Sequence, residues 1–377
     1  MIIKGANVFN ERGGFERRDI FTEGDFITSG GASGEEIDAR GLYAIPGLLD
    51  IHVHGCMGFE FTACGADGVK AMTRYQASRG VTALCPTTLT LPEKKLARAC
   101  GEISRTKTQD GASVIGINLE GPFISPQKTG AQNPSYVRPP DMDFFRRLQA
   151  ASNGMIKILS IAPEMDGAMD LIREISNEGK AVISIAHTTA TYDTAVEAFA
   201  AGAKLVTHLF NAMPPLHHRE PGVIGAAADT PGCRVELICD GIHVHPGVVR
   251  AAFKMFGDDR VVMISDSLMA AGLGNGEYEI GELPMKVNGK LATLAGSDTI
   301  AGSVTDLMGG LVTAVRDMGI PLHSAVKCAS TNPAAAIGVS DERGSLAPGH
   351  IADIVLLDES LEIVLVILRG NILRAGN

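Results

Sequence analysis

The feature that most constrains the fold of this 377-residue chain is a regular alternation of short apolar runs with longer segments of helical period. Eight apolar runs of strand length occur, at residues 44–52, 81–86, 114–120, 156–163, 181–187, 204–208, 235–240 and 261–266. Segments of helical period follow most of them, at 67–79, 92–106, 141–151, 167–178, 191–201 and 245–256. Continuous apolar runs are typical of parallel strands buried on both faces. Eight strand–helix units predict an α/β fold of the TIM-type (β/α)8 barrel class.

The two ends of the chain have a different pattern. Residues 1–44 and 345–377 contain short strand-like stretches separated by Gly, Asn and Ser. We expect both ends to pair into one small β-sandwich domain, which leaves residues 45–344 for the barrel. The Gly-rich segment 271–302 follows the eighth strand and predicts either a β-hairpin insertion or a lid. Helical segments at 303–318 and 321–337 then complete the barrel.

Charge and composition exclude several classes of protein. The net charge is −10 and there is no run of Lys or Arg, which argues against a nucleic-acid partner or an anionic membrane surface. The first residues lack the apolar stretch of a signal peptide, and no apolar run approaches the ~20 residues of a membrane span. The seven cysteines form no C-x-x-C pair and are expected to be reduced thiols, which predicts a cytoplasmic protein.

Polar side chains stand where the predicted strands end. The first barrel strand ends in His52 and His54, which point to the same side because side chains at i and i+2 share one face of a strand. The other strands end in, or run directly into, Glu120, His187, His208, Asp240 with His243, and Asp266. The C-terminal ends of the strands form the active-site mouth of a TIM barrel, so we expect these groups to converge.

Imidazoles and carboxylates together are ligands for a divalent metal. Taken singly, His187 or His208 would more often be a hydrogen-bonded core histidine, and Glu120 a salt-bridged barrel residue. Their convergence favours a metal site. Glu120 is the natural bridge between a first site at His52 and His54 and a second at the other two histidines, because a carboxylate can bridge two metals.

Two further residues suggest acid–base chemistry. Asp266 can take a proton from a metal-activated water and pass it to a leaving amine, although it can also be only another ligand. The metal and His243 are the candidates for stabilising an oxyanion. The alternative for His243 and His245 is a solvent-facing pair on a loop.

Three loops suggest substrate contacts in an acidic protein. One contains Gln132, a second contains Asn211 and Ala212 after the sixth strand, and the third is the His-His-Arg-Glu stretch at 217–220. Arg219 can bind a phosphate group through two parallel hydrogen bonds, which suggests an anionic substrate. The alternative is a solvated turn or an interface patch.

The chain resembles the amidohydrolase superfamily and, within it, the N-acetylglucosamine-6-phosphate deacetylases. The motifs that carry this resemblance are PGLLDIHVHG, CPTT, LEGPF, the HTTA after Ala186, HLFNAMPP, HHREPG, DGIHVHP, ISDSLMAAG, AGS and the closing GSLAPGHIADIVLLD. The resemblance implies deacetylation of N-acetyl-D-glucosamine 6-phosphate to D-glucosamine 6-phosphate and acetate in amino-sugar catabolism. The small-molecule partner would therefore be a phosphorylated N-acetylhexosamine.

The resemblance also implies site residues. Metal is expected at Glu120, His187 and His208, and the retained His52 and His54 allow a second ion. The cofactor would be one or two divalent ions per subunit, Zn first, with Fe, Mn or Co as alternatives. Asp266 would be the catalytic base and acid. Substrate contacts are implied for Ala131, Gln132, Asn211, Ala212, Arg219, His243, Thr305, Asp306 and Leu307, with the arginine offered across a homodimer interface.

Some alternatives stay open at this point. Relatives often have histidine at the position of Gln132, so an N-acetylgalactosamine-6-phosphate deacetylase is an alternative. A cyclic-amide hydrolase is a second, but such enzymes usually use a carbamylated lysine at the end of strand four. Here that strand ends in Ala162, Pro163 and Glu164, and Lys157 stands at its beginning. A non-catalytic scaffold would typically have lost ligands that this chain keeps.

Overall fold

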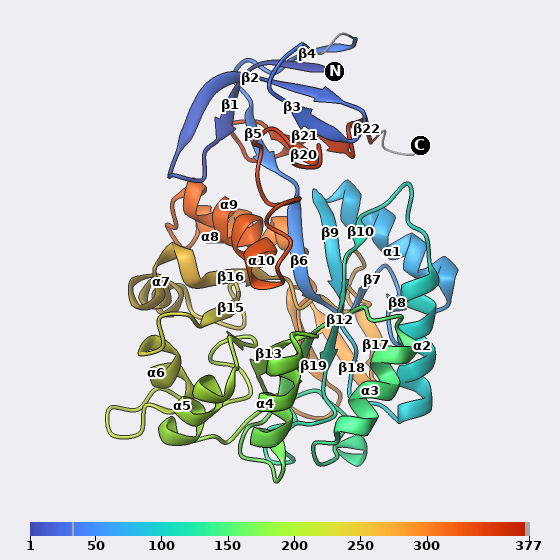
Figure 1. The fold of residues 1–377 in the computed structure, drawn as a ribbon, viewed down its shortest axis with the longest axis vertical. Helices are drawn as coiled ribbons and strands as arrows, with labels where there is room; N and C mark the ends of the chain where they lie inside the picture. Colours follow the sequence, from blue (N-terminus) through green and yellow to red (C-terminus); the bar gives the residue numbers. More distant parts are fainter. Residues whose placement is uncertain (32–33, 374–377) are drawn as a thin grey trace.

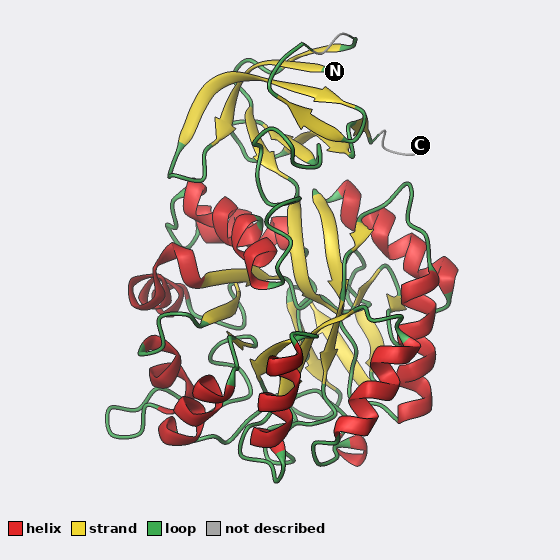
Figure 2. Ribbon diagram, in the orientation of Figure 1, coloured by secondary structure: helices red, strands yellow, loops and turns green. Residues whose placement is uncertain are grey.

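The computed structural model describes residues 1–31 and 34–373, so residues 32–33 and 374–377 of the expected terminal domain lie outside the described part. Strands from the N-terminal and C-terminal parts of the chain form a sheet at the top of Figure 1, above a larger body in which helices surround parallel strands. Figure 2 shows strands and loops in the upper part, with the helices placed around the strands of the lower part. The predicted α/β class is confirmed.

The strands of the lower body belong to two parallel sheets. One sheet has the order β10-β9-β6, and the other runs in sequence order from β11 to β16. A bridge between Thr87 and Asn118 joins β9 to β11, and the N–H of Asp266 donates to the C=O of His52, which joins β16 to β6. The bounds are β6 (Leu48–Val53), β9 (Val81–Pro86), β10 (Ser113–Val114), β11 (Ile117–Glu120), β12 (Ile156–Ile161), β13 (Val182–Ile185), β14 (Leu205–Val206), β15 (Arg234–Ile238) and β16 (Val261–Ile264).

The first predicted strand, 44–52, is divided in the structure. Its beginning belongs to β5 (Tyr43–Pro46), which pairs with a strand from the C-terminal end, and only the rest enters the parallel sheet β10-β9-β6 as β6. The residue at the break is Gly47. A larger residue does not fit there, because a Cβ would clash with Thr82. The expected run 114–120 is likewise two strands, β10 and β11.

Six predicted helices form close to their expected bounds: α1 (Ala66–Ser78), α2 (Glu93–Arg105), α3 (Met142–Ala151), α4 (Ala168–Glu178), α5 (Tyr192–Ala201) and α7 (Pro246–Arg260). Side-chain caps explain some starts, since Asp141 accepts from the N–H of Phe144 and Thr191 from that of Thr194. Within the described ranges, the helices are all too short or too polar to cross a membrane.

The remaining helices differ from expectation. Segment 303–318 contains only α8 (Leu307–Arg316), and 321–337 divides into α9 (Leu322–Ala329) and α10 (Thr331–Ala336). Pro333 explains this division, because it has no N–H to continue the hydrogen bonding of α9. Helix α6 (Gly222–Ala228) was not predicted, because its short sequence of small and apolar residues has no amphipathic period.

The sheet built from both chain ends has eight strands. Its order is β22-β21-β20-β5-β1-β2-β3, with β4 paired to β1. Buried residues such as Ile3, Ile20, Ile354 and Ile367 form a core that belongs to this sheet. The further bounds are β1 (Ile2–Phe9), β2 (Phe15–Glu23), β3 (Phe26–Thr28), β4 (Glu36–Asp38), β20 (Ile354–Leu357), β21 (Ile363–Leu368) and β22 (Asn371–Ile372).

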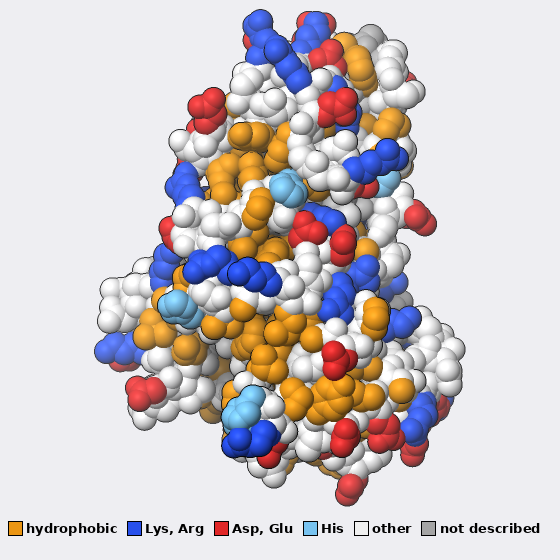
Figure 3. Space-filling view, turned by 90° about the vertical axis from the view of Figure 1, so that its left-hand side faces the viewer, with side chains coloured by type: hydrophobic (Ala, Val, Ile, Leu, Met, Phe, Trp, Pro, Cys, Tyr) orange, Lys and Arg blue, Asp and Glu red, His pale blue; other side chains and the backbone are white. Residues whose placement is uncertain are grey.

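The segment after β16 forms an antiparallel three-stranded sheet of β17 (Gly276–Ile280), β18 (Leu283–Asn288) and β19 (Leu291–Leu294). Its first turn is attached to the barrel by Glu282, which pairs with Lys95 and accepts from the hydroxyl of Tyr136 at 3.0 Å. The N–H of Gly281 donates to Glu60, in the small hairpin of β7 (Gly55–Cys56) and β8 (Phe59–Glu60), at 3.1 Å. On the face shown in Figure 3, basic and acidic side chains lie intermixed.

Candidate active site

A cavity of about 290 Å³ lies at the C-terminal ends of the parallel strands. The predicted residues that line it are His54, Glu120, Ala131, Gln132, His187, His208, Asn211, Ala212, His243 and Asp266. Ile280, Thr299 and Ile300 also line it, so the segment 271–302 forms both a β-hairpin insertion and one wall of the cavity. The ends of the parallel strands position the polar groups, and the inserted segment forms one wall beside them.

Glu120, the last residue of β11, stands at the centre of this cavity. Its Oε1 lies 3.2 Å from His187 Nε2, 3.1 Å from His208 Nε2 and 3.4 Å from His52 Nε2. Its Oε2 lies 3.2 Å from His54 Nε2. Burial raises the pKa of the Glu120 carboxyl, but the facing imidazoles hold this pKa well below its ordinary value. A single ionised carboxylate therefore contacts all four histidines.

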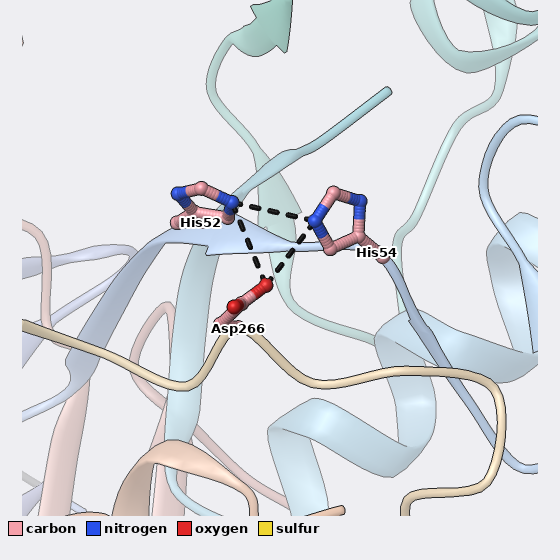
Figure 4. A group of neighbouring side chains, drawn as sticks. All are labelled: His52, His54 and Asp266. Carbon is pink, nitrogen blue, oxygen red and sulfur yellow. Dashed lines mark hydrogen bonds and ion pairs between the residues drawn. The ribbon is translucent and has the colours of Figure 1, made fainter. Parts of the chain in front are cut away.

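His52 and His54 project from β6 to the same side, and Asp266 faces them from the loop after β16 (Figure 4). The two Nε2 atoms lie 3.3 Å apart. Asp266 Oδ1 lies 3.6 Å from Nε2 of His52 and 3.2 Å from Nε2 of His54. These three residues form one potential ligand group, and Glu120, His187 and His208 form a second.

Several strand-end residues have a left-handed backbone. The φ angles are +43° at His187, +28° at His208, +48° at Asp266 and +50° at Ala212. Such conformations are uncommon for residues other than glycine and cost roughly 1–3 kcal/mol each. At His187, His208 and Asp266 they occur just after a strand ends, where the side chain is directed into the cavity, whereas Ala212 lies further along the loop after β14.

The hydrogen bonds of the imidazoles fit a bound cation. His187 Nδ1 lies 2.8 Å from the C=O of Lys128, which can only accept, so Nδ1 carries the proton and a neutral His187 has its lone pair at Nε2. This Nε2 atom faces His208 Nε2 at 3.1 Å. On the other side, His52 Nδ1 contacts the carboxylate of Glu236 at 2.9 Å. Carbonyl and carboxylate partners of this kind are typical of metal-ligating histidines. The donor set therefore fits a divalent metal.

His243 approaches the cavity from the loop after β15. Its Nδ1 lies 2.8 Å from Asp240 Oδ2, and Asp240 Oδ1 accepts from the backbone N–H groups of Ile242 and His243. Burial lowers the pKa of His243, but the contact with Asp240 raises this pKa by more than burial lowers it, so the net shift is upward. Burial raises the pKa of Asp240, but the contact with His243 lowers this pKa by a larger amount, so the net shift is downward. The pair holds the imidazole in one orientation, with Nε2 on the opposite side of the ring.

Not all of the expected substrate residues lie in this cavity. Arg219 is exposed and lines a different hollow, with Tyr192 and Pro221 among its neighbours. Asp306 caps α8 by accepting from the N–H of Gly309 at 2.7 Å and pairs with Arg79 at 2.7 Å. Leu307 is fully buried in the core. Thr305, Asp306 and Leu307 are not among the residues that line this cavity in the described part of the chain, where Thr299, Ile300 and Gly302 stand nearby in the sequence.

Sequence reasoning missed Glu236. It is fully buried on β15, beneath His52, and its Oε2 also accepts from the N–H of His208 at 3.3 Å. A signal was present, because Glu236 is the one acidic residue inside the apolar run Val-Glu-Leu-Ile. Lys157 stands at the start of β12, as expected, at the end of the strand opposite to the cavity.

Comparison with known proteins agrees with this geometry. The sequence matches the amidohydrolase family over residues 43–373. It is 37% identical to the N-acetylglucosamine-6-phosphate deacetylase of Bacillus subtilis over 333 residues, which are 87% of this chain and 84% of the relative. It is 33% identical to the bovine enzyme of the same name, over 98% of this chain and 93% of that protein.

Solved structures point the same way. A mutant of the N-acetyl-D-glucosamine-6-phosphate deacetylase from Mycobacterium smegmatis, in complex with N-acetyl-D-glucosamine-6-phosphate, superposes with a TM-score of 0.93 at 33% identity and covers 100% of this chain and 99% of that one. The Thermotoga maritima enzyme of the same name superposes with a TM-score of 0.90 at 28% identity and full coverage of both chains. The chain therefore belongs to the amidohydrolase family and, within it, to the N-acetylglucosamine-6-phosphate deacetylases.

Proposed function

We propose that this protein hydrolyses the acetamido group of N-acetyl-D-glucosamine 6-phosphate, releasing acetate and D-glucosamine 6-phosphate. The observation that carries the proposal is the convergence of four histidines on Glu120, with Asp266 beside them, inside a cavity. The relatives named after this reaction share the arrangement of the whole chain, which supports the same substrate class.

The proposed cofactor is zinc, as one or two ions per subunit. Imidazole and carboxylate donors suit this ion, with Fe, Mn or Co as alternatives. Glu120, His187 and His208 would hold one ion, and His52 and His54 would hold a second with Asp266. When bound, the metal lowers the pKa of a water molecule towards 7 and polarises the amide carbonyl.

Asp266 is the proposed base and acid. Burial raises the pKa of its carboxyl, but His54 and His52 lower this pKa by a larger amount. The group is therefore ionised near neutral pH. It would take the proton of the attacking water and return it to the amine nitrogen as the C–N bond breaks. Without this second transfer the leaving group would depart as an amide anion, which is far too basic.

His243 is the proposed partner of the substrate carbonyl. Asp240 accepts from its Nδ1, and because the pKa of His243 is raised, which favours the charged imidazole, a second N–H at Nε2 is available for an oxygen atom of the substrate. A hydrogen bond at this position strengthens as negative charge grows on the oxygen during attack. Asp240 thus acts through the orientation of His243.

For the phosphate group we propose Asn211 and Ala212, which line the cavity, together with Arg219 of a second subunit. The exposure of Arg219 and its separation from the cavity of its own chain support a donation across a homodimer. Ala131 and Gln132 would lie on the sugar side. Thr305, Asp306 and Leu307 remain predicted contacts on the acetyl side.

We further propose a closed (β/α)8 barrel at residues 45–344 and a small β-sandwich domain from 1–44 and 345–377. The bridge from Thr87 to Asn118 and the hydrogen bond from Asp266 to His52 support closure. The separate core of the terminal sheet supports the second unit. Seven free cysteines support a reducing compartment, and we propose the cytoplasm.

The test is acetate release from N-acetylglucosamine 6-phosphate, its galactosamine epimer and unphosphorylated N-acetylglucosamine, with metal content measured on the same sample. We expect fast release from the first, and little from the sugar that lacks phosphate. Faster release from the epimer would change the sugar assignment. No release from any of the three by fully metal-loaded protein would overturn the proposal.

A further inference from the structure

The side chain of Gln132 is held between two groups deep in the cavity wall. It is 4% exposed, although it belongs to the loop that leads to a short 3-10 helix at Pro134–Tyr136. Its Oε1 accepts from the backbone N–H of Thr90 at 2.6 Å, and its Nε2 donates to Glu120 Oε2 at 2.6 Å. A side chain that served only as a sugar contact would not need both of these partners.

The chemistry of these partners determines which way the amide points. The N–H of Thr90 can only donate, so the atom facing it must be the amide oxygen. The NH2 group of Gln132 then necessarily faces Glu120. The reverse orientation would place two donors against each other and the amide oxygen against a carboxylate oxygen. The hydrogen bond from Gln132 to Glu120 is therefore a consequence of the anchor at Thr90.

This hydrogen bond acts on the carboxylate oxygen that faces His54. Glu120 Oε1 faces His187 and His208, whereas Oε2 lies 3.2 Å from His54 Nε2 and accepts from Gln132. A carboxylate can rotate about the bond that joins it to the side chain. Rotation would move Oε1 away from His187 and His208, and Oε2 away from His54. Gln132 holds Oε2 and so opposes the rotation.

The anchor at Thr90 is closely packed. Gly121, directly after Glu120, has a φ of +83°, and a Cβ at this position would clash with Thr90 Oγ1. Thr90 therefore packs directly against the backbone that carries Glu120. Thr90, Gln132, Glu120 and Gly121 form a closed ring of contacts in which the amide is the only link that reaches the carboxylate.

We propose that Gln132 is a positioning residue for Glu120, which sets the bridging orientation of this carboxylate between the two ligand groups. With one N–H given to Glu120 and one lone pair of its oxygen given to Thr90, Gln132 has a second N–H and a second lone pair left for a substrate. The kinetic part of this inference rests on the proposed deacetylase function, whereas the part that concerns metal retention does not.

The test compares Gln132→Met, which keeps the side-chain volume but has no donor, with Gln132→His, whose neutral imidazole still has one acceptor and one donor. Gln127→Met is the matched control, because Gln127 is an exposed glutamine of the same loop. For each protein, zinc content is measured after dialysis, together with the rate of zinc loss to a chelator. Circular dichroism and thermal unfolding establish that each variant is folded.

We expect Gln132→Met to lose zinc about 10–100-fold faster than the unmodified protein, as for other partners of metal ligands. We expect Gln132→His to restore part of this retention and Gln127→Met to behave as the unmodified protein. With N-acetylglucosamine 6-phosphate, Gln132→Met should lower kcat as well as raise KM.

Unchanged zinc retention in folded Gln132→Met, with a rise in KM alone, would overturn the inference and leave Gln132 as a sugar contact only. If Gln132→Met does not fold, zinc retention in Gln132→His decides, and zinc loss from Gln132→His as fast as from a Glu120→Gln variant would contradict the inference. Failure of the unmodified protein to release acetate would contradict the proposed function but would leave the zinc measurements interpretable.

Discussion

His52 Nδ1 lies 2.9 Å from Glu236 Oε2, and both side chains are fully buried. The same oxygen accepts from the backbone N–H of His208 at 3.3 Å. One carboxylate beneath the cavity thus contacts a histidine from each ligand group. Burial lowers the pKa of His52, but the charges of Glu120 and Glu236 raise it well above its ordinary value. The surroundings of His52 therefore favour positive charge, which a bound metal would supply.

Replacing Glu236 by glutamine should weaken metal binding, because Glu236→Gln keeps the shape of the side chain but removes the negative charge beside His52 Nδ1. We expect metal affinity to fall about 10–100-fold. The measurement is a competition titration with a chromogenic chelator. The control is Glu11→Gln, at an exposed turn far from the cavity, which should leave affinity unchanged. Equal affinities for both variants would remove Glu236 from the metal site.

The role of Asp266 can be separated from metal binding. Asp266→Asn cannot take or return a proton, so we expect kcat to fall about 10²–10⁴-fold. Metal bound at Glu120, His187 and His208 should remain, because these ligands are unchanged. The measurement is acetate release alongside metal content. Retention of full turnover would show that another group moves the proton.

Arg219 offers a test of the proposed dimer. Arg219→Ala should raise KM for the phosphorylated sugar about 10–100-fold, which corresponds to the loss of hydrogen bonds to a charged group. If the arginine acts across the interface, a hybrid of one Arg219→Ala subunit and one Asp266→Asn subunit contains one complete site. Mixing the two variants under subunit exchange should then restore activity. An unchanged KM, or no recovery on mixing an exchanging pair, would argue against this role.

The pair of Asp240 and His243 predicts a pH-dependent stability. The pKa of His243 is raised above 6.5, so its contribution is fully present below pH 6.5 and is lost as the pH rises through the folded-state pKa. The pKa of Asp240 is lowered below 3.8, so its contribution is present above pH 3.8 and is lost as the pH falls through the folded-state pKa. The pair should therefore stabilise the fold most between pH 3.8 and pH 6.5, where both contributions are fully present.

Thermal unfolding of Asp240→Asn against the unmodified protein measures this effect. We expect a loss of about 1.5–3 kcal/mol near pH 6, as for hydrogen bonds to charged groups, and a smaller loss near pH 9. Asp341→Asn, at an exposed position, is the control and should have little effect at either pH. A loss that is independent of pH would mean that His243 is not charged in the folded protein.

The inserted sheet of β17 to β19 should keep the cavity closed through Glu282. Glu282→Ala removes the contacts to Lys95 and Tyr136, which are solvent-exposed and therefore contribute little to the stability of the fold. We expect up to about a fivefold rise in KM and faster hydrogen exchange in the strands on either side of this turn. Glu279→Ala, at an exposed position on β17, is the matched control and should change neither quantity.

The sequence alone determined the alternation of strands and helices, because buried parallel strands require continuous apolar runs and the helices between them require one apolar face. It also determined which polar residues end the strands. His52 and His54 share one side of a strand by local geometry, whatever surrounds them. The α/β class and the requirement for a divalent metal followed from these patterns.

Only the tertiary structure decided the partners of these residues. Glu236 meets His52 across 184 residues of sequence, and Gln132 meets Thr90 across 42, so no local pattern could relate them. The exposure of Arg219 and the capping role of Asp306 likewise depend on which elements pack nearby. Local periodicity specifies strands and helices within a few residues, whereas contacts between distant segments depend on the packing of the whole barrel and its inserted sheet.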